Sequence, residues 1–262
     1  MKKFNFVFVV ALSILCGFTQ ISEAKVKKTR KAKTEKKATI IPKLSSKEMG
    51  TEAKDDSRKT INGREYVDLG LPSGTLWATM NVGANHPEDY GDYFAWGEIA
   101  TKDVYNWSTY KWCMGNDEEF TKYCTFSRCG YKGFVDNKME LEPEDDAATA
   151  NWGSEWCMPS KEQQDELRNY CSTEWTTRNG VNGCLFTSNI NGASLFLPAA
   201  GLSGGGGLGY AGSDGYYWSR TLYSAYRPDL VHNLHFHLGN VDWNRLTRGC
   251  GRSVRAVRVS QN

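Results

Sequence analysis

Tryptophan is confined to one part of this 262-residue chain. All nine Trp residues lie within 61–262, whereas residues 25–60 contain no aromatic side chain and are rich in Lys, Thr, Ala and Ser. Aromatic side chains bury large apolar areas, so a stretch that lacks them has little to set against the conformational entropy lost on folding. We therefore predict one globular domain over 61–262, about 200 residues, which is long enough for a substantial core.

The two parts carry opposite charge. Residues 25–60 hold 13 Lys or Arg against 5 Asp or Glu, a balance of +8, while 61–262 holds 17 against 24, a balance of −7. Together with the low apolar content, this predicts a basic disordered linker over 25–60. Its run from Lys25 to Lys37 suits contact with anionic envelope polymers, but a solvated spacer is the favoured interpretation.

The N-terminus has the three parts of a secretory signal. Two lysines precede a largely apolar run over 4–18, and the small-residue site at 22–24 follows. The run is too short for an ordinary membrane span, so we predict a signal peptide over 1–24 and an exported protein that is periplasmic, surface-exposed or secreted. Export makes nucleic acid an unexpected partner. A lipid anchor at Cys16 is the alternative, but the bulky Leu15 before it argues against lipid attachment.

Seven cysteines remain after the predicted signal peptide, and an odd number leaves at least one thiol unpaired. In an oxidising compartment most are expected to pair, and the loop from Cys113 to Cys124 is the first candidate disulfide. No C-x-x-C pair exists anywhere in the chain, so a structural zinc site is not expected.

Local patterns predict an α+β fold with two modest helices, short antiparallel strands and long loops. Residues 65–69 and 75–78 form a strand, turn, strand pattern around Pro72-Ser73-Gly74. Ser160 and Gln163 form a capping box for a helix that ends near Cys171, and the acidic residues of 145–150 favour a second helix start. Short strands are expected over 183–187, 193–198, 216–221, 234–238 and 253–259.

Four phrases carry a resemblance to a known family. They are 68–77 (DLGLPSGTLW), 156–160 (WCMPS), 216–219 (YYWS) and 253–257 (SVRAV), with further matching runs over 91–98, 145–148 and 196–201. In this order they resemble the Fibrobacter succinogenes major paralogous domain family, exported modules of Bacteroidetes, over nearly all of 61–262. The resemblance implies a C-type lectin-like fold in which the first and last strands pair, which places 65–69 beside 253–259.

The same resemblance implies a distant similarity to the formylglycine-generating enzyme. Residues 158–160 and 253–255 are similar to that enzyme's corresponding motifs, but the enzyme uses two neighbouring cysteines near its C-terminus and Cys250 stands alone here. Since the site rather than the fold decides activity, we do not expect an enzyme. Cys157 replaces an Arg that the family usually shows, and Cys184 and Cys250 are also unusual for it.

Other motifs do not support a metal or a cofactor. Glu142-Pro143-Glu144 and Asp242-Trp243-Asn244 depart from the calcium-binding sequences of sugar-binding lectins. Gly204, Gly206 and Gly209 match G-x-G-x-x-G without the strand and helix that a phosphate site needs, which favours a flexible surface loop. His235 and His237 share one strand face while His232 points the other way, with no carboxylate partner identified.

Aromatic residues supply the remaining functional pattern, because flat rings beside polar groups suit carbohydrate stacking and protein hot spots. We therefore expect a non-catalytic exported binding module of the cell envelope whose ligand is a glycan or an envelope protein. An enzyme related to the formylglycine-generating group and a purely structural envelope protein are the alternatives. The expected ligand-binding residues are Tyr210, Tyr216, Tyr217, Tyr223, Asp242 and Trp243.

Overall fold

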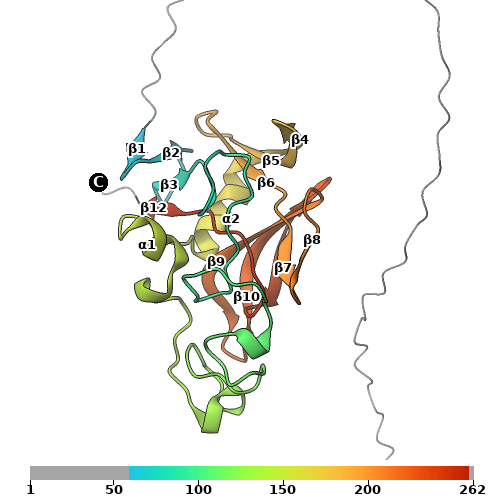
Figure 1. Cartoon of the computed structure of the whole chain (residues 1–262). Coiled ribbons are helices and arrows are strands. Elements are labelled where there is room, and N and C mark those ends of the chain that lie inside the picture. The colour runs from blue at the N-terminus through green and yellow to red at the C-terminus, as the bar shows by residue number, and fades with distance from the viewer. Residues whose placement is uncertain (1–58, 260–262) are drawn as a thin grey trace, which may run out of the picture. The chain divides into compact units, whose positions relative to one another are not determined.

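The computed structural model describes residues 59–259, which form a mixed helix and strand fold with few helices and antiparallel sheets (Figure 1). The predicted α+β class is thereby confirmed. The predicted signal peptide, Cys16 and the linker up to residue 58 lie outside the described residues. The linker prediction extends too far, because Thr60–Ile61 already form strand β1. Within 59–259 no helix has the length and apolarity needed to cross a membrane.

The first and last described strands belong to one sheet of order β1-β2-β3-β12. Strand β2 (Arg64–Asp68) and strand β3 (Thr75–Ala78) form the predicted strand, turn, strand unit. The expected direct pairing of 65–69 with 253–259 is wrong, since β3 lies between β2 and β12 (Val257–Val259). All four residues of β3 are buried, as a central strand requires.

Both predicted helices are present, and the second begins at the expected cap Ser160. In α1 (Ala147–Trp152) the Asp146 carboxylate accepts hydrogen bonds from two backbone N–H groups of the first turn. In α2 (Lys161–Tyr170) Ser160 and Gln163 form the predicted capping box. Helix α2 contacts β4, β5, β9 and β10, so it lies between two sheets (Figure 1). Four short 3₁₀ turns cover Trp107–Thr109, Ser127–Cys129, Tyr131–Gly133 and Pro143–Asp145.

The second half of the described chain is dominated by strands. One sheet has the order β4-β5-β6, another has the order β11-β10-β9, and β7 pairs with β8 as a hairpin. The strands are β4 (Cys171–Arg178), β5 (Val181–Ser188), β6 (Ser194–Pro198), β7 (Leu202–Gly204), β8 (Gly207–Gly209), β9 (Asp214–Ser224), β10 (Arg227–His237) and β11 (Asn240–Thr247).

Two of these elements correct the expectations from sequence. The glycine-rich stretch is not a loop throughout: it forms the β7 and β8 hairpin, whose two central glycines have positive φ. Strand β4 follows α2 without any turn residue between them, and most of its side chains face solvent. Periodicity therefore indicated a strand here only weakly.

Gly201 marks a position where the backbone itself leaves no room for a side chain. Its φ is +65°, and a Cβ built there would lie 2.2 Å from the Gly209 carbonyl oxygen. We predict that Gly201→Ala lowers the free energy of unfolding by about 3 kcal/mol, because strained φ and a backbone clash add. Urea denaturation measures the effect. Gly207→Ala is the matched control, since a Cβ there meets open space, and equal midpoints for both variants would contradict the prediction.

Candidate functional site

Five of the six expected ligand-binding residues lie on the β11-β10-β9 sheet but on its two opposite faces, while Tyr210 lies between β8 and β9. Tyr216 and Asp242 pair with His235 in register from the two neighbouring strands. Tyr223 and Trp243 instead approach His232, whose ring centroid lies 5.3 Å from that of Tyr223 and 6.3 Å from that of Trp243. Since side chains alternate along a strand, His232 and His235 project to different faces. The six residues therefore do not form one site.

Tyr217 is a core residue and not a ligand contact, which corrects its place among the expected residues. Its side chain is only 1% exposed and its ring stacks on Phe236 at 5.8 Å. The Tyr217 hydroxyl donates to the Pro198 carbonyl and accepts from Asn81. Burial raises the pKa of Tyr217 to about 12. It faces away from Tyr216 because successive residues of a strand alternate.

On the face that carries His235, aromatic rings cover one another. The Tyr216 ring stacks on His235 with centroids 4.4 Å apart, and Tyr210 meets Tyr216 edge-on. Asp214 Oδ1 lies 2.9 Å from His235 Nε2, so a carboxylate partner for this histidine exists after all. Asp242 accepts a hydrogen bond from Asn240. This face offers ring edges and paired polar groups rather than an open aromatic surface.

The opposite face holds a concave pocket of about 350 Å³, here called the Trp243 pocket. Three aromatic rings line it without stacking on one another, since Tyr223 and Trp243 each meet His232 at a steep interplanar angle. The rings thus lie beside polar groups without covering one another. The full lining is Tyr223, His232, Trp243, Asn244 and Arg245.

Cationic side chains lie against two aromatic rings of the Trp243 pocket. Helix α2 places Lys161 Nζ 5.0 Å and Arg168 Cζ 5.3 Å from the Trp243 ring. The Arg245 guanidinium lies 5.1 Å from the Tyr223 ring and donates to the Tyr223 hydroxyl. Lys161 is paired with Asp165, whereas Arg168 and Arg245 form no ion pair with any carboxylate of residues 59–259.

His232 is the titratable ring of this pocket. Burial lowers the pKa of its imidazole below the usual range and Lys161 lowers it further, while Asp165 and Glu162 oppose the shift. A base with a lowered pKa binds its proton less readily in the folded chain than in the unfolded chain. The stability linked to neutral His232 is therefore fully present above its unfolded pKa of about 6.5, and is lost as the pH falls through the lowered pKa.

We predict that His232→Gln makes the free energy of unfolding less dependent on pH below about 6.5, because the residue whose protonation opposes folding is gone. Urea denaturation at a series of pH values from about 7.5 to 5 measures this dependence. The control is His86→Gln, since the His86 side chain is 71% exposed. An unchanged slope in the His232 variant, or an equal change in both, would contradict the assignment.

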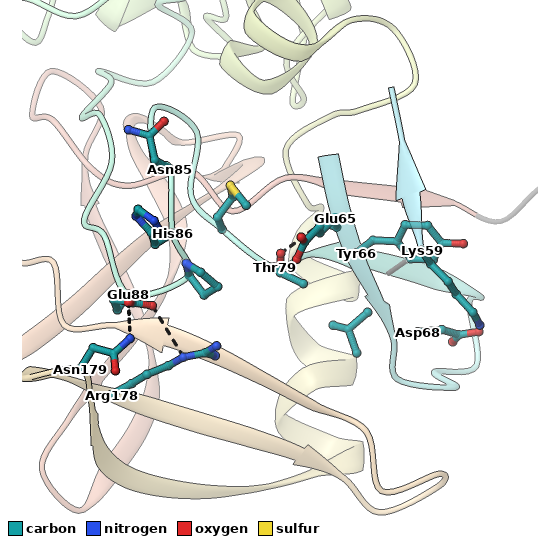
Figure 2. A pocket seen from close by; sticks show the side chains of 13 residues that line it. Lys59, Glu65, Tyr66, Asp68, Thr79, Asn85, His86, Glu88, Arg178 and Asn179 are labelled. Carbon is teal, nitrogen blue, oxygen red and sulfur yellow. Dashed lines mark hydrogen bonds and ion pairs between the residues drawn. The ribbon is translucent and has the colours of Figure 1, made fainter. Parts of the chain in front are cut away.

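A second cleft lies elsewhere on the domain and has a different lining (Figure 2). It has a volume of about 630 Å³ and is lined by residues near β2, by the loop 85–88 and by the tip of the β4 and β5 hairpin. Glu88 accepts a hydrogen bond from Asn179 at 2.5 Å and lies 3.7 Å from Arg178 (Figure 2). Its charged groups are thus partly paired with one another, and Tyr66 and His86 are the aromatic residues among those that line it.

One group of acidic side chains has the spacing of a metal site. Glu142, Glu144 and Asp145 place one oxygen each within 4.8 Å of the others. Lys122 already supplies a cation there, with Nζ 2.6 Å from Glu142, 2.6 Å from Asp145 and 3.6 Å from Glu144. Burial alone would lower the pKa of Lys122, but hydrogen bonds to Asp145 and Glu142 raise it. The ammonium group satisfies this cluster.

The expected disulfide between Cys113 and Cys124 is not formed. Both thiols are free and buried, and each lies within hydrogen-bond distance of a backbone carbonyl, Trp107 for Cys113 and Phe126 for Cys124. Burial raises the pKa of both thiols, which favours the protonated form. The other cysteines in the described range are also free, namely Cys129, Cys157, Cys171, Cys184 and Cys250.

Sequence reasoning found Tyr223 and Trp243 but missed the cations beside them. Arg245 lies on β11, a strand that was not predicted, so its alternation with Trp243 could not be used. Lys161 and Arg168 are seven residues apart, two turns of α2, and that spacing places them on one side of the helix. Their approach to Trp243 is a tertiary contact without a local signal.

Comparison of the chain with protein-family models, with curated proteins and with solved structures returned no match.

Proposed function

We propose that this chain is an exported, non-catalytic binding module of the bacterial cell envelope and that it binds a saccharide in the Trp243 pocket. One observation carries the proposal: Tyr223, His232 and Trp243 line one concave pocket with polar side chains at its margin. Sugar rings present apolar C–H faces and polar edges, so aromatic faces flanked by hydrogen-bond donors match them.

The size of the pocket favours a saccharide over an envelope protein as the ligand. Its volume of about 350 Å³ lies near the lower end for small-ligand sites, which are roughly 300–1,000 Å³. A stable protein partner instead buries about 800 Å² on each side around an apolar centre. The lining here is polar at Asn244 and Arg245. An envelope protein stays the second candidate ligand.

The proposal includes a C-type lectin-like fold and membership of the Fibrobacter succinogenes major paralogous domain family. Three features support it: the terminal strands share one sheet, a capped helix follows the phrase at 156–160, and short antiparallel strands complete the chain. Export is supported by the signal-like residues 1–24. The rival proposal, an enzyme related to the formylglycine-generating group, requires an activity that is lost when Cys250 is replaced.

The experiment is a binding screen of the purified whole chain against host and microbial glycans and envelope proteins, with and without calcium. We expect saturable binding to a saccharide that does not require calcium and that depends on the Trp243 pocket. Binding that is confined to proteins would support the second candidate ligand. No binding to any saccharide, or saccharide binding that survives the loss of Trp243, would overturn the proposal.

A further inference from the structure

We propose that the Trp243 pocket selects saccharides that carry a carboxylate, such as uronic acids, over neutral sugars. This inference rests on the proposed function and specifies its ligand class. It depends on the cations of the pocket and not on its aromatic rings. The two proposals can therefore fail separately.

The charge of the pocket is opposite to that of the domain around it. Residues 61–262 carry 24 acidic against 17 basic side chains. None of the five residues that line the pocket is acidic, and Arg245 is one of them. Lys161 and Arg168 of α2 lie against the Trp243 ring, which is one wall of the pocket, without lining the pocket themselves. A local positive charge on an acidic domain attracts anions to this position specifically.

Two of these three cations have no carboxylate partner within residues 59–259. The Asp165 carboxylate is engaged by Lys161. Arg168 and Arg245 form no ion pair with any carboxylate within residues 59–259, and Glu162 of α2 acts on His232 only through space. Within residues 59–259 the Arg245 side chain donates one hydrogen bond, from Nη1 to the Tyr223 hydroxyl. Most of its five N–H donors therefore stay available for a ligand.

The kind of cation indicates the kind of anion. A guanidinium group presents parallel N–H donors that match the two oxygens of a carboxylate, and such paired bonds are stronger than neutral ones. Arg245 lies beside Tyr223, whose hydroxyl it already contacts. A sugar ring against the aromatic side chains thus brings a ring carboxylate to Arg245. Sulfated sugars share the negative charge but not the planar shape.

The test compares an oligogalacturonide with its fully methyl-esterified form, which is neutral but has the same backbone. Calorimetry with the purified whole chain gives the dissociation constants. We expect the acid form to bind at least about tenfold more tightly than the ester and to weaken with added salt. A sulfated galactan serves as the third ligand, and we expect it to bind more weakly than the acid form.

The variant Arg245→Gln tests the contribution of the guanidinium group separately from that of the aromatic rings. We expect about tenfold weaker binding of the acid form with little change for the ester, and Arg245→Lys in between. The control is Arg227→Gln, which removes an equal charge from a guanidinium that is paired with Asp229, lies at the turn of the β9 and β10 hairpin and does not line the pocket. Three results would overturn the carboxylate preference and leave saccharide binding standing: ester binding as tight as acid binding, an equal loss in both arginine variants, or tighter binding of the sulfated galactan.

Both proposals would be overturned if neither form bound and the glycan screen also gave no binding.

Discussion

Replacing Arg248 with methionine is expected to lower the free energy of unfolding by about 3 kcal/mol. Arg248 is fully buried at the end of the strand region. Its Nη1 donates to the Tyr123 carbonyl at 2.9 Å and its Nη2 to the Lys122 carbonyl at 3.1 Å. Its Cζ lies 3.6 Å from the Phe120 ring centroid. Methionine keeps part of the contact with Phe120 but leaves both carbonyl oxygens without these donors.

The physical reason for the size of this effect is the asymmetry of buried hydrogen bonds. Each buried carbonyl that loses its partner costs about 1–3 kcal/mol. Removal of a charge that burial disfavours offsets part of this cost, since burial lowers the pKa of Arg248. Two orphaned carbonyls outweigh that gain. The hydrogen bonds that are lost hold the backbone around Tyr123, so we expect local unfolding of that segment first.

Urea denaturation measures the change in stability, and hydrogen exchange locates it. We expect increased exchange over about residues 105–135, where Tyr105, Tyr110 and Phe120 pack in one cluster. Arg245→Met is the matched control, because Arg245 lies three positions away and is exposed. A loss below about 1 kcal/mol in the Arg248 variant, or exchange that rises evenly over the domain, would contradict this role for Arg248.

Trp243→Ala is expected to weaken saccharide binding by about 30-fold or more, which corresponds to about 2 kcal/mol. The indole is the largest ring of the pocket. Two cationic side chains of α2 lie over it, with Lys161 Nζ 5.0 Å and Arg168 Cζ 5.3 Å from the ring centroid. These contacts fix its orientation before a ligand arrives. Alanine removes both the stacking surface and one wall of the pocket.

The measurement is calorimetric titration with the tightest saccharide of the glycan screen. Circular dichroism and thermal denaturation verify that the variant folds, which we expect because Trp243 is only partly buried. Tyr226→Ala is the matched control: Tyr226 is 77% exposed, packs edge-on against Phe126 and does not line the pocket. Equal losses in the two variants would show that the Trp243 effect is nonspecific.

Much of the fold was predictable because its signals are local. The Ser160 and Gln163 capping box lies within four residues, and the strand over 75–78 follows a proline and glycine turn that needs no distant partner. Strand β11 was missed because its side chains alternate only between intermediate and exposed. The pairing of the terminal strands through β3 depended on distant residues and was expected incorrectly.

The candidate site was predictable only in part. The sequence places aromatic residues near one another along the chain, and this pattern predicted Tyr223 and Trp243 as ligand-binding residues. The sequence did not distinguish these two residues from the buried Tyr217, because burial depends on which parts of the strands are covered by α2 and by the neighbouring sheets. Contacts such as those of Lys161 with Trp243, or of Arg248 with Tyr123 across 125 residues, also have no local signal.

The sequence by itself determined the two helix starts and most of the strands, because capping and alternation act over short distances. Only the tertiary structure decided which expected residues share a face and which cations reach the Trp243 pocket. A strand's alternation specifies two faces but not which one is covered. That choice depends on packing between elements that are far apart in the chain, as where α2 lies between two sheets (Figure 1).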